Sequence, residues 1–212
     1  MCGRFVLTTD PRTLARVFRL NTPSGEQAQD TAFDFAPDED IRPGERVLTL
    51  RREAKGSRWE RPRWGFTVGD RRFVINARLE TAQEKAAFRQ AFAEGRCVVP
   101  ADGWYEWPVK GGPPTLLAGA DGRPLALAGL VREGAPGAPS EVVILTTASH
   151  PAIAAIHDRM PAILPVDSID AWLDPRVRSP KSLRHLVVTT EELPLATRAA
   201  APLPARKALR GD

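Results

Sequence analysis

Cysteine and histidine are scarce in this chain of 212 residues, which contains two cysteines and three histidines. Two cysteines cannot build the disulfide framework of a small secreted protein, so we expect free thiols in a reducing compartment. The histidines are scattered and lack the close ligand spacing of zinc motifs, so no metal site is expected.

Long apolar runs are also missing. No stretch approaches the roughly 20 continuous apolar residues that a membrane helix needs, and residues 1–20 lack the apolar core of a signal peptide. We therefore expect a cytoplasmic protein, or one associated with the nucleoid. The hydrophobic fraction of 42% is ordinary for a soluble globular domain, and the chain is long enough for one domain with a substantial core.

Strand-like segments outnumber helical ones. Asp10-Pro11 offers an N-cap and a first-turn proline for one helix, and Thr81-Ala82-Gln83-Glu84 is typical of a capping box for a second that ends before Gly95. Shorter helices are expected over residues 149–156 and 166–173. Strands are expected at the start of the chain and near 46–52, 57–66, 71–76, 96–100, 103–108, 114–118, 124–130 and 141–147. This order predicts an α+β domain with a mainly antiparallel, barrel-like β core and a few flanking helices.

Two segments are expected to lack regular structure. Residues 22–45 form a polar, proline-containing stretch that we expect to be a mobile loop. Residues 193–212 are rich in alanine, proline and arginine. We therefore expect a single domain over residues 1–192, followed by a disordered basic tail.

The net charge of +4 is modest, but it is unevenly distributed. Residues 25–40 are rich in acidic side chains, whereas residues 51–72 carry many arginines interleaved with Trp59 and Trp64. Basic and aromatic residues together suit single-stranded nucleic acid, because phosphates meet positive charge and bases stack on rings. A solvated, arginine-rich hairpin explains the same pattern, so composition leaves both interpretations open.

Cys2 has unusual chemistry if Met1 is removed, as is normal when the second residue is small. Cysteine would then carry a free α-amine and a thiol two carbons away. The pKa of an α-amine is roughly 7.7–8.0, against about 10.4 for lysine, so a useful neutral fraction can condense with an aldehyde to an imine. The thiol can then close a five-membered thiazolidine ring. The alternative is that cysteine stands here by accident and that Phe5 merely begins a strand.

Three other segments carry polar groups suited to this chemistry. Asn76 and Arg78 share one face of a predicted strand, where an amide can orient a sugar or amine and a guanidinium can bind phosphate. Glu106 stands among large aromatic residues, which raise the pKa of a carboxyl toward the range useful for proton transfer. His157 stands at a turn, where it could protonate a sugar ring oxygen. Each residue also has a purely structural explanation. Asn76 and Arg78 can be the polar face of a strand, Glu106 a surface carboxylate and His157 a structural histidine.

Two further residues, Cys97 and Arg159, have simpler explanations than catalysis. Cys97 lies in an apolar run that predicts a buried strand, so we expect packing rather than reactivity. Arg159 either forms a local ion pair with Asp158 or helps to hold phosphate.

Taken in order, these segments resemble the SRAP family (SOS-response-associated peptidase), whose members process abasic sites in DNA. Each motif is weak alone, but all of them in the family's order are specific. They spread over about residues 1–173 and comprise MCGRF, Ala36-Pro37, Trp64-Gly65, NARLET, RCVVPADGWYEW, Leu127-Ala128-Gly129-Leu130, TTAS and IHDRMPAIL.

The resemblance implies covalent capture of abasic sites in single-stranded DNA through a thiazolidine. It assigns the nucleophile to Cys2 and the positioning of amine and lesion to Asn76. It assigns proton transfer during imine formation to Glu106, and action on the ring-opened sugar and cross-link reversal to His157. No cofactor is implied. The expected DNA contacts, including the ambiguous Arg159, are Arg4, Trp64, Arg78, Thr146 and Arg159.

Two segments depart from the family pattern. Asp34-Phe35-Ala36-Pro37 lacks the asparagine usual before the second strand, and the region after Leu186 lacks a closing motif that contains Val-Asn. These differences concern the expected DNA groove and leave the four catalytic positions intact.

Three classes of function compete. The first is a covalent abasic-site sensor with AP-lyase activity, the second a thiol peptidase that uses Cys2, His157 and Glu106. The third is a non-catalytic, basic module that binds single strands. The first is favoured, because no peptide pocket is recognisable and simple binding does not explain the four-residue set. The expected partners are single-stranded DNA with abasic sites and replication-fork proteins, with no membrane, for a protein that acts as a monomer.

Overall fold

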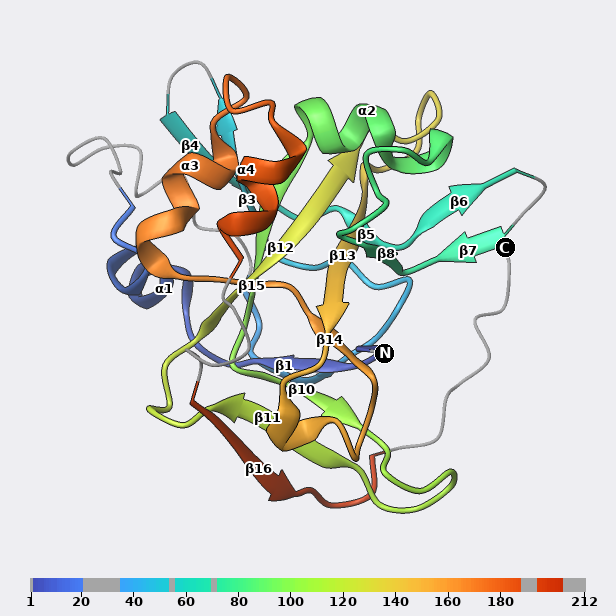
Figure 1. Ribbon diagram of the computed structural model, residues 1–212, viewed down its shortest axis with the longest axis vertical. Coiled ribbons are helices and arrows are strands. Elements are labelled where there is room, and N and C mark those ends of the chain that lie inside the picture. The colour runs from blue at the N-terminus through green and yellow to red at the C-terminus, as the bar shows by residue number, and fades with distance from the viewer. Residues whose placement is uncertain (1, 21–34, 54–55, 70–71, 188–193, 204–212) are drawn as a thin grey trace.

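β-Strands make up most of the protein, whose computed structural model describes residues 2–20, 35–53, 56–69, 72–187 and 194–203 (Figure 1). The larger sheet has the order β14 (Arg159–Pro161), β13 (Glu141–Ala148), β12 (Leu125–Arg132), β9 (Arg96–Ala101), β3 (Thr49–Glu53), β4 (Gly56–Glu60). Three short strands join it: β15 (Ile163–Leu164) pairs with β12, and both β5 (Arg63–Trp64) and β8 (Asn76–Arg78) pair with β13.

The smaller sheet has the order β16 (Leu195–Ala199), β11 (Thr115–Gly119), β10 (Gly103–Glu106), β1 (Phe5–Leu7), β2 (Asp38–Ile41). A separate hairpin is formed by β6 (Phe66–Val68) and β7 (Arg72–Val74). Among the described strands, only the pairings of β13 with β5 and β8 are parallel. The prediction of one mixed domain with a mainly antiparallel core and few helices is therefore confirmed.

The predicted barrel-like closure is wrong, and the reason lies at Asp102. The chain passes through this residue from β9 in the larger sheet to β10 in the smaller one. The Asp102 carboxylate accepts hydrogen bonds from the backbone N–H groups of Thr8 and Thr9, at 2.7 and 3.0 Å. This fixed corner directs the chain into a second sheet. The strands β2, β4, β14 and β16 therefore remain sheet ends instead of closing one barrel.

The described α-helices flank the sheets: α1 (Pro11–Val17), α2 (Ala86–Glu94), α3 (Ile169–Leu173) and α4 (Pro180–His185). α1 begins as predicted, because Asp10 Oδ1 accepts the backbone N–H groups of Arg12 and Thr13. The helix expected over 149–156 is only a single 3₁₀ turn, η1 (Pro151–Ile153), whereas 166–173 contains η2 (Val166–Ser168) and α3. None of the described helices is long and apolar enough to cross a membrane.

The start predicted for α2 is wrong, although its end before Gly95 is confirmed. The Thr81 hydroxyl, expected to cap the helix, has no hydrogen-bond partner among the described residues. The Leu79 N–H donates to the Thr146 carbonyl of β13 at 2.9 Å. This contact with the larger sheet holds the following residues in turns, and the helix begins only at Ala86.

Two segments expected to be irregular contain strands, so the prediction is wrong there. β2 lies within residues 22–45, and β16 lies within the expected tail. β16 pairs with β11 along its whole length, although its side chains are largely exposed. Backbone hydrogen bonds, rather than apolar burial, therefore order it, and an apolar pattern could not reveal it. Residues 21–34 and 204–212 lie outside the described residues.

The buried guanidinium of Arg96 joins three elements of the core. It donates hydrogen bonds to the carbonyls of Phe92 and Ala93 at the end of α2, and to those of Trp172, Asp174 and Val177 around the end of α3. Helix C-termini carry partial negative charge, so these carbonyls compensate a charge that burial would otherwise make costly. Burial lowers the pKa of Arg96 from its ordinary value.

We expect Arg96→Lys to destabilise the protein by about 3 kcal/mol, because an ammonium cannot replace five donors in a planar fork. Urea denaturation followed by circular dichroism would show a lower midpoint with an unchanged slope. An unchanged midpoint would contradict the role given to Arg96. Arg123→Lys, at an exposed ion pair, is the control that should have little effect.

Candidate active site at the N-terminus

β1 brings the start of the chain to Glu106. The strand pairs antiparallel with β10, with Phe5 opposite Trp104. Continuing this register by two residues places Gly3 opposite Glu106, so Cys2 lies beside the carboxylate. Cys2 and Glu106 are both buried, with 0% and 4% of their surface exposed. The Cys2 thiol and the Glu106 carboxyl thus lie at the same end of this antiparallel strand pair, away from water.

Asn76 holds Cys2 from the other sheet. It begins β8, which pairs with β13 in the larger sheet. Its Nδ2 donates to the backbone carbonyl of Cys2 at 2.8 Å. Its Oδ1 is buried and has no hydrogen-bond partner among the described residues. An acceptor therefore remains beside Cys2 for an amine or a hydroxyl group.

The tautomer of His157 follows from its neighbours. Its Nδ1 lies 2.9 Å from the backbone nitrogen of Arg159 and 2.9 Å from Asp158 Oδ1. One nitrogen cannot accept from the first and donate to the second at once. The backbone N–H is a fixed donor, while Asp158 is 83% exposed and hydrated. In the neutral ring Nδ1 therefore accepts from Arg159, and the proton resides on Nε2.

The charges of these groups act on one another. Burial, and then the charge of Glu106, raise the pKa of the Cys2 thiol above its ordinary value. Burial also raises the pKa of Glu106, although the positive charges of the chain's α-amino group and of His157 oppose the shift. Among the described residues, no three His, Cys, Asp or Glu side chains lie close enough to hold a metal ion. The structure thus brings together the four residues that the sequence proposed: Cys2, Asn76, Glu106 and His157.

A cavity of about 370 Å³ adjoins this cluster, since Gly3 and Ile75, the sequence neighbours of Cys2 and Asn76, line its wall. Its other lining residues are Arg4, Arg42, Pro43, Phe73 and Trp107. Two aromatic rings and two guanidinium groups therefore face one space beside the reactive residues. Rings suit a nucleobase, and guanidinium groups suit a phosphate.

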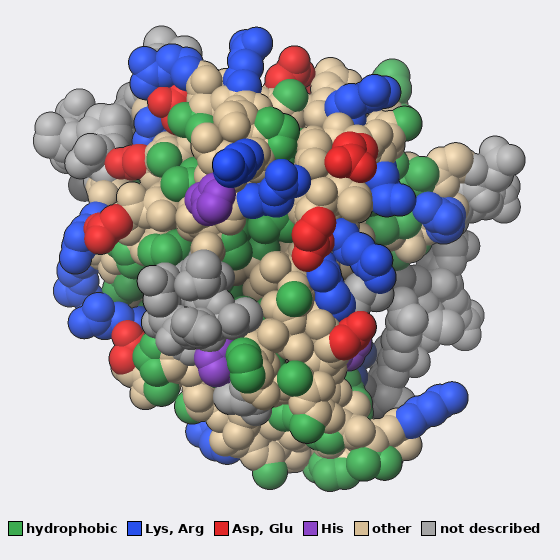
Figure 2. All heavy atoms as spheres, viewed as in Figure 1, with side chains coloured by type: hydrophobic (Ala, Val, Ile, Leu, Met, Phe, Trp, Pro, Cys, Tyr) green, Lys and Arg blue, Asp and Glu red, His purple; other side chains and the backbone are tan. Residues whose placement is uncertain are grey.

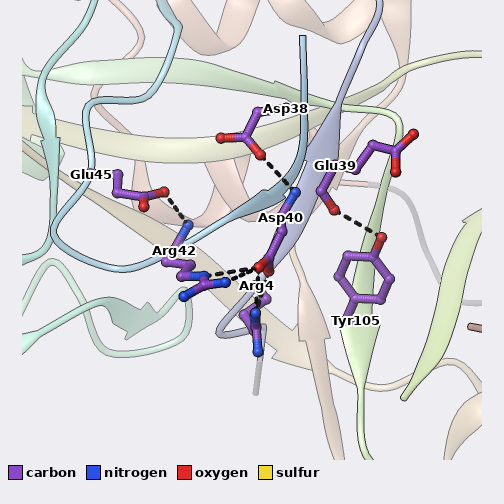
Figure 3. Close-up of polar contacts among 7 residues, drawn as sticks. All are labelled: Arg4, Asp38, Glu39, Asp40, Arg42, Glu45 and Tyr105. Carbon is purple, nitrogen blue, oxygen red and sulfur yellow. Dashed lines mark hydrogen bonds and ion pairs between the residues drawn. The ribbon is translucent and has the colours of Figure 1, made fainter. Parts of the chain in front are cut away.

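Asp40 fixes the two arginines of this cavity. Its carboxylate lies between Arg4 and Arg42 and accepts hydrogen bonds from both (Figure 3). Burial alone would raise the pKa of Asp40, but the hydrogen bonds from the two arginines outweigh it and lower the pKa below its ordinary value. The Arg4 guanidinium also lies over the Trp107 ring, 5.8 Å from its centroid. The charges of Glu45 and Asp38 also act on Arg42, so the two guanidinium groups are held among several carboxylates.

Comparison with known proteins identifies the family. The model of the SOS response associated peptidase (SRAP) family matches residues 1–201. The chain belongs to the SRAP family. The match extends through β16, which confirms that the strand in the expected tail is part of the family domain.

Named relatives agree with this assignment. The SRAP chain is 31% identical over 203 residues to the abasic site processing protein YoqW of Bacillus subtilis, covering 88% of this chain and 86% of the relative. It is 30% identical over 185 residues to the abasic site processing protein YedK of Escherichia coli, covering 82% and 79%. A crystal structure of a phage-related protein from Bordetella bronchiseptica has a TM-score of 0.73 at 26% identity, covering 93% and 94%. A Bacteroides thetaiotaomicron protein shares the fold, with a TM-score of 0.72 at 21% identity over 92% and 91% of the chains.

Two residues expected to contact DNA are buried in this SRAP protein. Trp64 is fully buried, its ring packs edge-on against Phe5 at 5.1 Å, and its Nε1 donates to the Ile75 carbonyl at 3.0 Å. Thr146 is 1% exposed, and its hydroxyl lies 3.4 Å from the Ala77 carbonyl. Both side chains are thus packed against protein groups, and their contact with DNA stays a prediction. Both residues connect β8 to its neighbours.

The three arginines that we expected to contact DNA differ in their exposure and in their partners. Arg78 is exposed, and its guanidinium forms no hydrogen bond or ion pair with the residues that the structure describes. Arg4 lines the cavity beside Asp40. Arg159 is only 13% exposed and pairs with Glu80, not with its sequence neighbour Asp158. Arg78 is therefore the most accessible of the three, whereas Arg4 and Arg159 each pair with a carboxylate, Asp40 and Glu80.

Sequence reasoning missed the cavity residues Arg42, Phe73 and Trp107, as well as Asp40, which holds two arginines of the cavity wall. Asp40 and Arg42 lie in the segment expected to be an irregular loop. The Trp64-Gly65 motif does account for Phe73: Gly65 has φ +123°, and a Cβ there would lie 2.1 Å from the Phe73 ring. The glycine lets the ring pack against the backbone. The motif was visible in the sequence, but its long-range partner was not.

Glu106→Gln tests the cost of burying this carboxylate. Its pKa in the folded protein is raised above the ordinary 4.5. The folded state then binds more protons than the unfolded state above about pH 4.5, so stability falls as the pH rises through the folded pKa. The amide removes this loss. We expect urea midpoints of the variant to exceed those of the parent at about pH 7 and to approach them at about pH 4. A larger stability advantage of the variant at acidic pH would contradict a raised pKa for Glu106.

Proposed function

We propose that this SRAP protein captures abasic sites in single-stranded DNA covalently, through the aminothiol of Cys2 after removal of Met1. The observation that carries the proposal is that Asn76 and Glu106 meet at Cys2, the second residue of the chain, and that His157 is close enough for its charge to act on Glu106. The names of the relatives support the same substrate, because they are abasic site processing proteins. The family's name also contains the word peptidase, so peptide cleavage is an outcome to test.

The reaction begins with the abasic sugar. In its closed form the sugar is a cyclic hemiacetal. The protonated His157 ring donates its Nε2 proton to the ring oxygen, and the hydroxyl on the anomeric carbon releases its own proton to water as the ring opens to the aldehyde. The neutral α-amine of Cys2 attacks the aldehyde carbon and forms a carbinolamine. Asn76 holds the Cys2 backbone by its carbonyl, which sets the direction of attack.

Glu106 carries the proton through dehydration. Its raised pKa allows the protonated carboxyl to persist closer to neutral pH, and it protonates the departing hydroxyl as water. The product is an imine between Cys2 and the sugar carbon. The Cys2 thiol then adds to the imine carbon, and its proton passes to the nitrogen. The aldehyde and the aminothiol are thus converted into a thiazolidine and one water, without oxidation or reduction.

The order of these steps follows from the thiol. Burial and Glu106 raise the pKa of Cys2, so the sulfur is a neutral thiol at physiological pH. A neutral thiol is a weak nucleophile toward an aldehyde, whereas it adds readily to a protonated imine next to it. The amine therefore attacks first, and the thiol closes the ring.

The adjoining cavity would take the nucleotide next to the lesion. Phe73 and Trp107 offer ring faces for an unstacked base, while Arg4 and Arg42 offer donors for its phosphate. A base inside a duplex is stacked and paired and cannot enter such a space. The cavity therefore favours a single strand.

Cys2→Ala should abolish the covalent product. Purified protein incubated with a single-stranded oligonucleotide that contains one abasic site should give a shifted band on a denaturing gel. We expect the band to disappear with Cys2→Ala and to persist with Cys97→Ala, the matched variant of the other buried thiol. A band that survives Cys2→Ala would exclude the mechanism, and Cys2-dependent cleavage of a peptide substrate without a DNA band would favour the peptidase.

Phe73→Leu should weaken DNA binding without removing the apolar volume that packs on Gly65. Stacking of one base on an aromatic ring contributes about 1–3 kcal/mol, so affinity should fall roughly fivefold to 150-fold. Fluorescence anisotropy with an oligonucleotide that carries a tetrahydrofuran abasic analogue, which cannot react, measures the change. Phe88→Leu removes a buried ring of α2 that does not line the cavity and should bind as the parent does. Equal losses in both variants would refute stacking.

A further inference from the structure

Glu80 is the meeting point of three arginines from three segments. Arg159, at the start of β14, donates both terminal nitrogens to the two carboxylate oxygens, each at 2.8 Å. Arg184, on α4, approaches the Glu80 backbone carbonyl with its Nη1 at 3.4 Å. Burial would raise the pKa of Glu80, but the hydrogen bonds from Arg159, helped by the charge of Arg78, lower it. Glu80 is therefore ionised and binds the cluster together.

Two of the three arginines near Glu80 are accessible to a ligand. Arg159 is largely buried, and besides Glu80 it donates to the Thr146 carbonyl at 2.6 Å. Arg78 and Arg184 are exposed, and neither forms an ion pair with a described acidic residue. Three guanidinium groups face the carboxylate of Glu80 and that of Glu84, which Gln83 holds beside the Glu80 carbonyl, so the net charge is positive by one. The surface around Glu80 therefore suits an anion, and its fixed base is the ion pair of Arg159 with Glu80.

The position of Arg184 is set by the fold. The preceding residue, Leu183, is fully buried and anchors α4 against the core. Ser179 caps the helix, with its hydroxyl accepting the Ser182 N–H at 3.3 Å. An anchored helix keeps the next side chain at the surface beside Glu80 instead of leaving it on a free loop. Figure 2 shows Lys and Arg side chains over α4 and between α4 and β8 on this face.

The cluster is continuous with the candidate active site. The backbone N–H of Arg159 donates to His157 Nδ1, and Arg78 ends the strand that Asn76 begins. The basic surface thus runs from the reactive residues through Arg78 to Arg184. Phosphates of a strand whose abasic sugar lies at Cys2 would pass over the same surface.

We propose that Arg184 binds a phosphate of the DNA strand outside the abasic nucleotide, next to a phosphate bound by Arg78. This inference rests on the proposed function, because it takes single-stranded DNA as the ligand. The proposal adds to the DNA contacts a residue of α4, which lies beyond the sequence motifs shared with the family. Glu80 acts here as a positioning residue, which holds the buried base of the site and itself binds no DNA.

The salt dependence of binding tests the contact. Each phosphate contact to a single strand contributes about 0.7 to the slope of log affinity against log salt concentration. We expect Arg184→Ala to lower the slope by about 0.7, so that its loss of affinity is about 2.6-fold greater at 50 mM than at 200 mM salt. The full-length protein and the unreactive tetrahydrofuran oligonucleotide are used, with anisotropy as the readout.

Two variants serve as controls. Arg184→Lys keeps the charge and should restore the slope, and Arg123→Ala removes the same charge from an exposed ion pair with Asp121 and should leave the slope unchanged. Oligonucleotides shortened on one side of the lesion locate the phosphate: the effect of Arg184→Ala should vanish for one of the two shortened strands. A slope for Arg184→Ala equal to that of the parent, or an effect retained with both shortened strands, would overturn the proposal.

The covalent band on a denaturing gel separates this inference from the proposed function. A parent protein that cross-links abasic DNA, combined with an unchanged slope for Arg184→Ala, would reject only the role of Arg184. A changed slope without any covalent band would support the phosphate contact and reject the capture by Cys2.

Discussion

The hydrogen bond from Asn76 Nδ2 to the Cys2 carbonyl fixes the part of a chain that is usually least ordered, its beginning. β1 is paired on both sides in the smaller sheet, while Asn76 comes from the larger one. An amine attached to this backbone has its position set by two sheets. A lysine amine, in contrast, moves at the end of a flexible four-carbon chain. Rigid placement and a low amine pKa are what capture of an aldehyde requires, and the N-terminus supplies both.

Shared carboxylates organise the positive charge around this site. Asp40, Glu80 and Glu141 each hold arginines that come from other strands or loops. At least one partner of each pair is largely buried, so each guanidinium group is held in a fixed position. Each carboxylate restricts the directions in which its guanidinium groups point. The arginines in these clusters are Arg4 and Arg42, Arg159, and Arg63 and Arg132.

The sequence could predict residues whose chemistry is local. A cysteine at position two and a glutamate among aromatic residues identified Cys2 and Glu106, and the Asp10 cap identified α1. What it could not predict depends on distant partners. The start of α2 is set by a hydrogen bond to β13, and β16 is ordered by its backbone pairing with β11. The tryptophan of the Trp64-Gly65 motif resembled a DNA contact, but it packs in the core, because burial is decided by residues far away in the chain.

Mass spectrometry of the cross-linked protein tests the central claim most directly. After nuclease and protease digestion, the account predicts that the abasic sugar is found on the peptide that begins at Cys2, with Met1 absent and the mass lowered by one water relative to the separate components. Met1 retained in the cross-linked material, or the sugar attached to another residue such as Cys97, would contradict it.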